Sequence, residues 1–435
     1  GASGRRFESA RPDHLFFGGG FTLNPEEILQ KYHDHINPGL ADLLQLGGLA
    51  AVDERADGAY VWDTEGNKYL DAVGGYGVFA LGHRPPKVIE KVKEALDKMP
   101  MASKIFINSC EAELGEKLSQ ATGYQYFMFL NSGSEAVETA LKLARLTTGR
   151  TTFIGMTNAY HGVTFGALSI SGRDVYKEPF KPLLPGVKIV PFGDAEALAE
   201  ALDESVAAVI VEPIQGEGGV NVPPPGYLKK VRRLCDDAGC FLILDEIQTG
   251  MGRTGKLLAE EWEDVKADIV CLGKALGGGV VPIGAVGATE KAWQGFIDNP
   301  LIHESTFGGN PLATSAGIAA VEEIMGRQIW NNAHVMGEKL RNALMNEADK
   351  YPHLVKEVRG RGLLIGVEMM EEGYGLPMMG FMLEEKTLVA YTLNNPRVIR
   401  IEPPLIIGDE EIQWLVSAFH KALVKLDQLA KDLEV

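Results

Sequence analysis

The sequence predicts an α/β protein whose main domain is a mainly parallel β-sheet sandwiched by helices. Between about residues 105 and 300, short apolar runs alternate with amphipathic segments, the pattern of parallel strands and their connecting helices. Turn residues bound these runs, as expected for strands buried on both faces. The flanking parts lack this alternation, and we expect them to form a smaller α+β domain built from both termini. The expected division is an N-terminal arm and part of the small domain at 1–104, the large domain at 105–310 and the C-terminal small domain at 311–435.

The individual elements follow from local patterns. Residues 1–24 are glycine-rich, and we expect a mobile arm or a segment ordered only on a partner subunit. A helix is expected at 25–36, where Pro25 lies in the first turn, and a β-hairpin is expected at 60–70. In the large domain we expect strands at 127–130, 152–154, 188–190, 206–211, 241–244 and 269–272, and helices at 135–146 and 227–238. Further on we expect helices at 312–325, 329–351 and 409–433, and strands at 363–369 and 398–401.

Composition limits the possible partners. The chain has 435 residues, 45% of them hydrophobic, which is enough for two domains with cores, and its formal net charge is −17. That charge disfavours nucleic acid and anionic membrane surfaces. No apolar run approaches the ~20 residues of a membrane helix, no signal peptide is visible, and the four cysteines have no CxxC spacing. We therefore expect a reduced, cytoplasmic protein without nucleic-acid or membrane partners, and no metal site is predicted.

Two expected strands end in residues that carry chemistry. The run 241–244 leads into Asp245, and the run 269–272 leads through Gly273 to Lys274 and the glycines 277–279. Ligands bind at the carboxyl ends of strands in open α/β sheets. A lysine in a mostly apolar setting loses proton affinity, and only its neutral amine attacks a carbonyl. The glycines would leave room for a flat ring, and an aspartate below a pyridine ring keeps its nitrogen protonated.

A phosphate site is predicted where a strand meets a helix. Ser132 and Glu135 have the spacing of a capping box, which marks a helix N-terminus. Such an end offers free backbone N–H groups, and Gly133 allows an anion to come close. This cap would exist with or without a ligand. Its combination with Lys274 and Asp245 favours phosphate binding.

Residues 243–250 (ILDEIQTG) and 272–279 (LGKALGGG) resemble the signature of class III pyridoxal-phosphate (PLP) aminotransferases. The resemblance extends over essentially the whole chain after about residue 25. It implies the fold type I PLP-transferase fold, PLP as cofactor, and Lys274 as covalent anchor and general acid/base of a ping-pong reaction. The chain is most similar to the putrescine (diamine) branch in 181–186, 223–228 and 392–395, although Gly273 stands where that branch often has alanine.

The resemblance also implies how the cofactor is bound. Gly133 and Ser134 match the positions that hold the phosphate. Thr306 matches a residue that donates its hydroxyl to the same phosphate from the neighbouring subunit. The protein is therefore expected to be a homodimer, or a dimer of dimers, with shared active sites.

Four further residues are expected around the ring. Tyr160 matches the residue that stacks on the pyridine, and the amide of Gln248 can bind the phenolic oxygen of the ring. Glu212 lies at a strand end and is expected to support the site. His161 has two open interpretations, a partner of a residue that touches the cofactor or an ordinary polar loop residue.

The substrate residues are also matched by resemblance. Tyr76 and Phe79 belong to a glycine-rich loop that lines the family's substrate pocket. Arg400 matches the arginine that binds the carboxylate of the oxo acid, for which a planar guanidinium is suited. Glu217, between glycines, matches the gate that pairs with this arginine and swings away for the oxo acid.

The expected reaction moves the terminal amino group of a diamine, putrescine or cadaverine, or of a similar primary amine to a 2-oxo acid, 2-oxoglutarate or pyruvate. An aminotransferase for ornithine, acetylornithine or another ω-amino acid would share every catalytic residue and is the main alternative. An aminomutase of the same fold and a non-catalytic homologue are further alternatives.

Overall fold

The computed structural model describes residues 24–433, in two units that divide after Val52. The first unit contains α1 (Pro25–His35) and α2 (Pro38–Leu46). α1 starts as expected, because the Asn24 side chain accepts from the backbone of Glu27 and the Glu27 carboxylate accepts from the backbone of Asn24. The arm expected at residues 1–24 lies outside the described residues except for Asn24.

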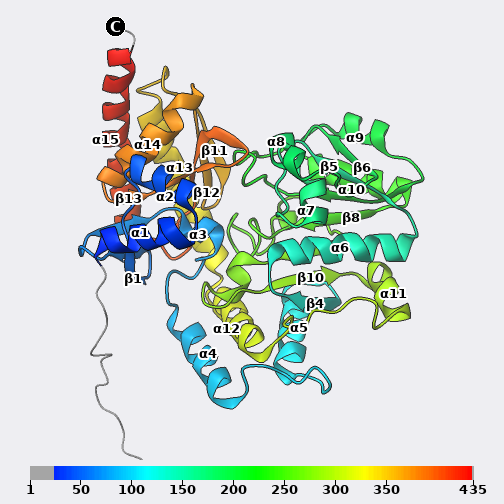
Figure 1. Cartoon of the computed structure of the whole chain (residues 1–435). Coiled ribbons are helices and arrows are strands. Elements are labelled where there is room, and N and C mark those ends of the chain that lie inside the picture. Colours follow the sequence, from blue (N-terminus) through cyan, green and yellow to red (C-terminus); the bar gives the residue numbers. More distant parts are fainter. Residues whose placement is uncertain (1–23, 434–435) are drawn as a thin grey trace, which may run out of the picture. The chain divides into compact units, whose positions relative to one another are not determined.

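A seven-stranded sheet forms the main layer of the second unit (Figure 1). Five of the seven strands, β9, β8, β7, β5 and β6, are parallel to one another, as expected. All residues of β7, β8 and β9 are buried. In spatial order the strands are β4 (Tyr126–Leu130), β10 (Gly284–Ala288), β9 (Ile269–Leu272), β8 (Phe241–Asp245), β7 (Val206–Val211), β5 (Thr152–Met156) and β6 (Val187–Val190).

The sequence did not predict β10, which is antiparallel to both of its neighbours. Its residues are only glycine, alanine and valine, so its intrinsic strand preference is weak. A glycine of this strand is required by a tertiary contact. A Cβ at Gly284 would lie 2.1 Å from the backbone oxygen of Ser132, beside the predicted phosphate site.

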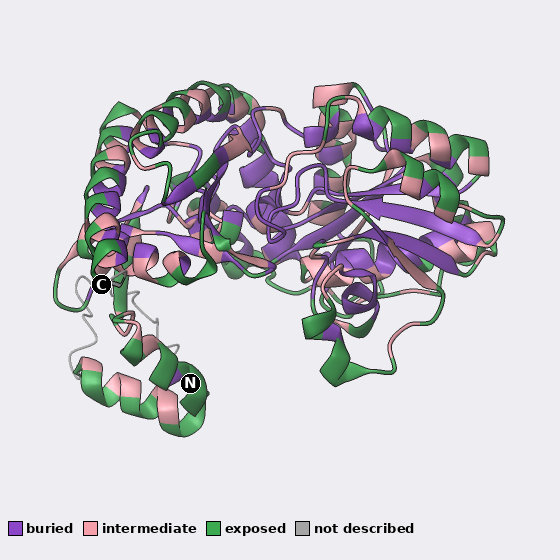
Figure 2. Ribbon diagram, turned by 90° about the horizontal axis from the view of Figure 1, so that it is seen from above, coloured by how far each residue is buried: buried purple, intermediate pink, exposed green. Residues whose placement is uncertain are grey.

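Helices cover both faces of this sheet, and Figure 2 shows buried strands inside helices that expose their outer sides. One face carries α6 (Gly133–Thr148), α7 (Phe165–Ile170) and α11 (Glu290–Asp298). The opposite side has α5 (Ser109–Thr122), α9 (Ala195–Ala201) and α10 (Tyr227–Ala238). α12 (Pro311–Arg327) packs on α5, and α4 (Pro86–Lys98) packs on α12. This part of the chain also contains four short helices, α8 (Asp174–Lys177), η1 (Glu178–Phe180), η2 (Ala259–Glu263) and η3 (Lys274–Gly277).

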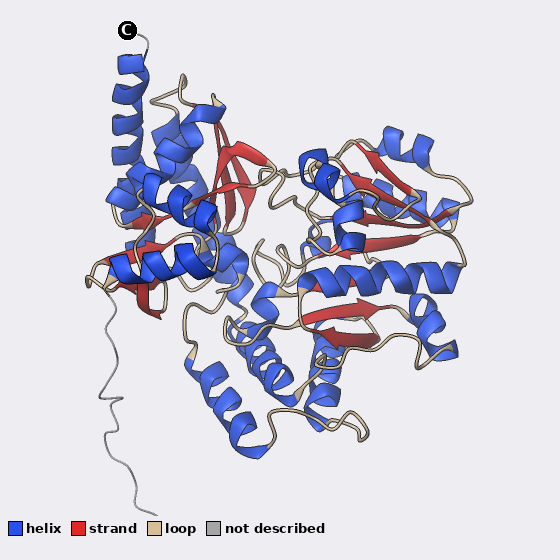
Figure 3. Cartoon of the chain, viewed as in Figure 1, coloured by secondary structure: helices blue, strands red, loops and turns tan. Residues whose placement is uncertain are grey.

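Two four-stranded sheets lie beside the main one (Figure 3). The first contains the expected hairpin, in the order β1 (Asp53–Asp57), β2 (Tyr60–Asp63), β3 (Lys68–Asp71) and β13 (Thr387–Leu388). The second is antiparallel, in the order β11 (Val355–Arg361), β12 (Leu364–Met369), β15 (Asn395–Ile401) and β14 (Ala390–Thr392). The associated helices are α3 (Gly74–Gly77), α13 (Ile329–Ala348), η4 (Glu372–Tyr374), α14 (Gly375–Glu384) and α15 (Asp409–Leu433).

The pairing of β3 with β13 brings together strands from the two ends of the second unit. It supports our proposal that 311–435 and the later part of 1–104 share a smaller domain flanking 105–310. No helix within residues 24–433 has both the length and the apolar character needed to cross a membrane.

Candidate active site

A cavity of about 190 Å³ lies at the carboxyl ends of β8 and β9. It gathers most of the residues that the sequence predicted for cofactor binding. Its lining contains the predicted residues Gly133, Ser134, Tyr160, His161, Glu212, Asp245, Gln248 and Lys274, together with Ser132, Gly162 and Ile247.

Lys274 reaches this cavity from an unusual backbone conformation. It follows β9 by two residues, starts η3 and has φ +44°, a region that residues other than glycine seldom adopt. Burial lowers the pKa of its amine, Arg400 lowers it further, and the carboxylates of Glu402, Glu217 and Asp245 oppose this. The neutral, nucleophilic amine is therefore favoured relative to an exposed lysine.

The glycines after Lys274 do not leave room for a ring, contrary to the sequence-based expectation. A Cβ at Gly278 would lie 2.9 Å from Val88, and one at Gly279 would lie 2.7 Å from the ring of Phe79. Both have positive φ, so they serve a tight turn packed against apolar side chains.

Asp245 is held by His161. Nδ1 of His161 lies 2.7 Å from Oδ2 of Asp245, and both side chains are buried. Burial works against a charged imidazole, yet the hydrogen bond and the charge of Asp245 raise the pKa of His161. Of the two interpretations left open by the sequence, the geometry favours a partner that orients Asp245. The other oxygen of Asp245 accepts from the backbone N–H of Ile247 at 3.1 Å.

The N-terminus of α6 also lines the cavity, through Ser132, Gly133 and Ser134. Ser132 accepts from the backbone of Glu135 at 3.2 Å, as the predicted cap requires. The reciprocal bond differs, since the Glu135 carboxylate accepts from the backbone of Asn131 rather than of Ser132. A Cβ at Gly162 would lie 2.1 Å from the Ser134 hydroxyl oxygen, so the glycine allows two backbone segments to approach here.

Glu212 ties two loops of the site together. Its carboxylate accepts from the backbone N–H of Tyr160 at 2.9 Å and from that of Gly216 at 3.0 Å. Burial raises the pKa of Glu212 to about 7, with Asp245 adding to the rise. Because its oxygens bind backbone groups, Glu212 supports Tyr160 and the loop that carries Glu217.

The predicted ion pair of Arg400 and Glu217 is formed. Arg400, on β15 and 1% exposed, donates from Nη1 to Oε1 of Glu217. Oε2 of Glu217 accepts from the backbone N–H of Leu393 at 2.9 Å. The sequence analysis missed Glu402, which is buried next to Arg400. Residues two apart along a strand share a face, and that spacing was the available signal.

Tyr76, Phe79 and Thr306 are not among the residues that line the cavity. Tyr76 is 52% exposed, and the Arg400 guanidinium lies 5.1 Å from the centre of its ring. Phe79 packs against His83, with ring centres 3.9 Å apart and the rings tilted by 36°. Thr306 is exposed. Their roles toward substrate and phosphate stay predictions.

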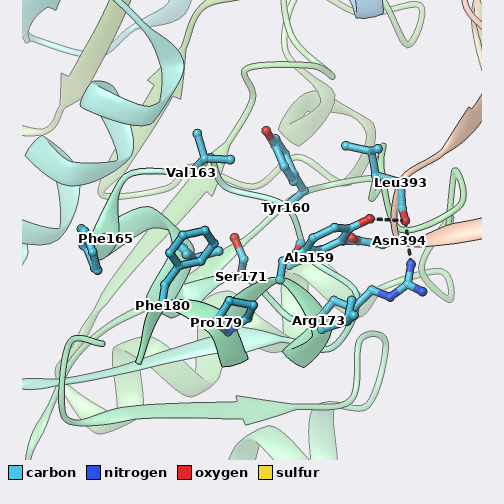
Figure 4. Close-up of a pocket in the computed structure, with 14 residues that line it drawn as sticks. Ala159, Tyr160, Val163, Phe165, Ser171, Arg173, Pro179, Phe180, Leu393 and Asn394 are labelled. Atoms are coloured by element: carbon cyan, nitrogen blue, oxygen red, sulfur yellow. Dashed lines mark hydrogen bonds between the residues drawn. The ribbon is translucent and has the colours of Figure 1, made fainter. Parts of the chain in front are cut away.

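A second cavity, of about 410 Å³, is shown in Figure 4. It adjoins the first, because Tyr160 and Gly162 line both. Arg173 and Tyr176 in its wall both donate to the backbone oxygen of Leu393, at 2.6 and 3.0 Å. The rest of the lining is mainly apolar and includes Val163, Phe165, Leu168, Val175, Pro179 and Phe180.

Residues 47–423 match the family model described as aminotransferase class-III, and the chain belongs to this family. It is 37% identical to the ornithine aminotransferase of Toxoplasma gondii, with a TM-score of 0.84 over 88% of this chain and 92% of that one. It is 32% identical to the acetylornithine aminotransferase of Elizabethkingia anophelis, with a TM-score of 0.81 over 93% of this chain and 100% of that one. It is 29% identical to an (S)-enantioselective omega-transaminase of Thermomicrobium roseum, with a TM-score of 0.86 over 93% of this chain and 99% of that one.

The protein is thus a PLP-dependent class III aminotransferase of the omega-transaminase type, with the fold type I PLP-transferase architecture. The residues present fit the cofactor. The cavity contains a lysine amine whose pKa is lowered by burial, a carboxylate oriented by His161 and a helix N-terminus closely approached by Gly162, which suit an aldehyde, a pyridine nitrogen and a phosphate. PLP, when bound, supplies the carbonyl that takes up the substrate nitrogen and a ring that accepts electrons from the bond being broken.

Proposed function

We propose that this aminotransferase moves the terminal amino group of a diamine, putrescine or cadaverine, to a 2-oxo acid, 2-oxoglutarate or pyruvate. The observation that carries the proposal is the buried ion pair of Arg400 and Glu217. With Glu217 in place, the guanidinium is neutralised and suits a donor without a carboxylate at that end. An oxo acid then takes the place of Glu217, because losing this carboxylate without a replacement would leave positive charge unbalanced in a buried site, at a cost of several kcal/mol.

The other proposed roles follow from position. Lys274 Nζ takes the proton from the substrate carbon that bears the nitrogen, and Asp245 holds the pyridine nitrogen protonated. Gln248 would bind the phenolic oxygen of the ring. Gly133 and Ser134 would hold the phosphate, and Tyr160 would lie against the ring.

Ornithine is the main alternative donor, and the 37% identity to an ornithine aminotransferase favours it. Ornithine carries a carboxylate at the end remote from the reacting amine, which requires a cation to bind it. Among the described residues, Arg173 supplies the one guanidinium that lines the second cavity. This guanidinium already donates to the backbone oxygen of Leu393. This arrangement supports a donor without a remote carboxylate, as does the resemblance of 181–186, 223–228 and 392–395 to the diamine branch.

A panel of amine donors tests the proposal. Putrescine, cadaverine, ornithine and N-acetylornithine are each mixed with the PLP-loaded enzyme in single turnover, and the absorbance of the cofactor is followed. We expect kcat/KM for the diamines to exceed that for ornithine at least ~10-fold, because a buried carboxylate without a partner costs more than 1.4 kcal/mol. A higher value for ornithine or N-acetylornithine would replace the diamine assignment. Conversion of an amino acid to an isomer without added oxo acid would indicate an aminomutase.

We also propose a homodimer in which Thr306 serves the phosphate site of the neighbouring subunit. Thr306 is exposed, and two nearby segments expose large apolar side chains, as subunit interfaces do before assembly. Ile105, Phe106 and Ile107 are 85, 82 and 96% exposed, and Leu301 is 82% exposed. Lys104 and Asn108 donate to Gly308 and Gly309, so the first segment lies beside the loop that follows Thr306.

Mixing two defective variants tests the shared site. Lys274→Ala lacks the reactive amine, and Thr306→Val should bind PLP ~10-fold or more weakly through loss of a charge-assisted hydrogen bond. In a hybrid dimer, one site would contain both native residues. We therefore expect activity at limiting PLP to exceed the sum of the separate variants. Activity equal to that sum, with hybrids verified by native mass spectrometry, would rule out a shared site.

A further inference from the structure

Glu402, one residue beyond β15, is fully buried between two guanidinium groups. Its Oε2 lies 3.4 Å from Nε of Arg400, and its Oε1 lies 3.6 Å from Nε of Arg253. Both arginines are also buried. Ions removed from water in this way must be balanced by partners, or the fold is destabilised. We therefore consider them together with Glu217, the other partner of Arg400, as a four-charge cluster of Arg253, Arg400, Glu217 and Glu402.

Glu402 also fixes the side chain of Gln248, which lines the cofactor cavity. Nε2 of Gln248 donates to Oε2 of Glu402 at 2.9 Å. Because a carboxylate can only accept, this bond sets which end of the amide is the nitrogen. The nitrogen keeps a second N–H for a ligand in the cavity.

The glycine-rich turn of α3 covers the Glu402 carboxylate. A Cβ at Gly77 would lie 2.6 Å from Oε1 of Glu402, and one at Gly74 would lie 2.3 Å from the backbone oxygen of Glu402. Both glycines have positive φ. The close approach excludes water from the carboxylate, so its charge acts at short range in a medium of low polarity.

The negative charge of Glu402 also influences the amine of Lys274. Among the carboxylates that oppose the lowering of the Lys274 pKa by burial, Glu402 has the largest influence, ahead of Glu217 and Asp245. Glu402 thus acts on two residues of the cofactor cavity, Lys274 through space and Gln248 through a hydrogen bond.

We propose that Glu402 is a positioning residue for transamination, the fixed negative charge of the four-charge cluster, in which Glu217 is the exchangeable one. With Glu217 in place, the cluster holds two positive and two negative charges. When the carboxylate of a 2-oxo acid takes the place of Glu217 at Arg400, the balance is kept because Glu402 stays. The inference rests on the proposed exchange at Arg400 and is independent of which amine is the donor.

Glu402→Gln tests the charge, because the amide has nearly the same shape. In the cofactor-free protein, the acetylation of Lys274 by acetic anhydride is measured against pH by peptide mass spectrometry. We expect the midpoint to move to lower pH by about one unit, since a nearby negative charge has been removed. The control is Asp268→Asn, which removes another carboxylate bound to an arginine, 2.7 Å from Arg232 and at the opposite end of the strands. An unchanged midpoint in Glu402→Gln, or the same movement in the control, would overturn the proposal.

Kinetics of the loaded enzyme give a second test. Without the charge of Glu402, the site is more positive, so KM for a cationic amine should rise ~10-fold while KM for the 2-oxo acid should not rise. Equal changes in the two KM values would contradict a fixed counter-charge. A wrong diamine assignment would appear instead as a different order of donors in the unmodified enzyme, so the two failures are distinguishable.

Glu402→Asp provides the test if the Gln variant does not fold, as judged by circular dichroism. It keeps the charge but shortens the side chain by one methylene, so Gln248 loses its anchor. We expect the midpoint of Lys274 acetylation to remain at the same pH, whereas the pH titration of the PLP absorbance should shift. A moved midpoint, or an unchanged absorbance titration, would contradict the proposal.

Discussion

Replacing Lys274 with alanine is expected to reduce steady-state transamination by a factor of about 10⁴ or more, because the proposed anchor and the proton carrier are the same amine. No other lysine lines the cofactor cavity in the part of the chain that the structure describes. The variant should still bind PLP weakly, since the α6 N-terminus and Asp245 are left intact. Turnover is measured with amine and 2-oxo acid at saturation, and PLP binding is measured by equilibrium dialysis.

Lys291→Ala is the control for the loss of a lysine, because Lys291 is exposed on α11. Its activity should equal that of the unmodified enzyme. Steady-state turnover of Lys274→Ala within tenfold of the control would remove Lys274 from the mechanism. An unfolded variant would be recognised by its circular dichroism and by the absence of PLP binding.

The part of the site that could be predicted from the sequence depends on local patterns. The runs 241–244 and 269–272 are short, apolar and bounded by turns, so they could be identified as buried parallel strands. They are adjacent in the sheet, with Asp245 paired in register with Cys271. Asp245 and Lys274 therefore reach the same edge, as the strand pattern predicts.

The rest depends on contacts between segments far apart in the chain. Asp245 meets His161, which is 84 positions away, and Glu402 meets Gln248, which is 154 positions away. No periodicity encodes such pairs. Gly278 and Gly279 were misinterpreted for a similar reason, since their neighbours Val88 and Phe79 come from a distant part of the sequence.

Arg400→Ala should separate the two halves of the reaction. The oxo acid half-reaction is expected to slow by about 10²-fold in kcat/KM, because a buried arginine–carboxylate pair contributes on the order of 3 kcal/mol when one partner is removed. The amine half-reaction should slow less than ~10-fold. Glu217 loses its cation but still accepts from the backbone N–H of Leu393. Each half-reaction is followed separately by stopped-flow absorbance of the cofactor.

Arg397→Ala provides a matched control on the same strand. Strand β15 exposes Arg397 and buries Arg400, so the control removes an arginine from β15 without touching the four-charge cluster. It should leave both half-reactions unchanged. Equal slowing of the two half-reactions in Arg400→Ala would mean that the arginine supports the fold of the site rather than the carboxylate of the acceptor. A loss confined to the oxo acid would instead mean that the acceptor carboxylate takes the position that Glu217 holds in the structure.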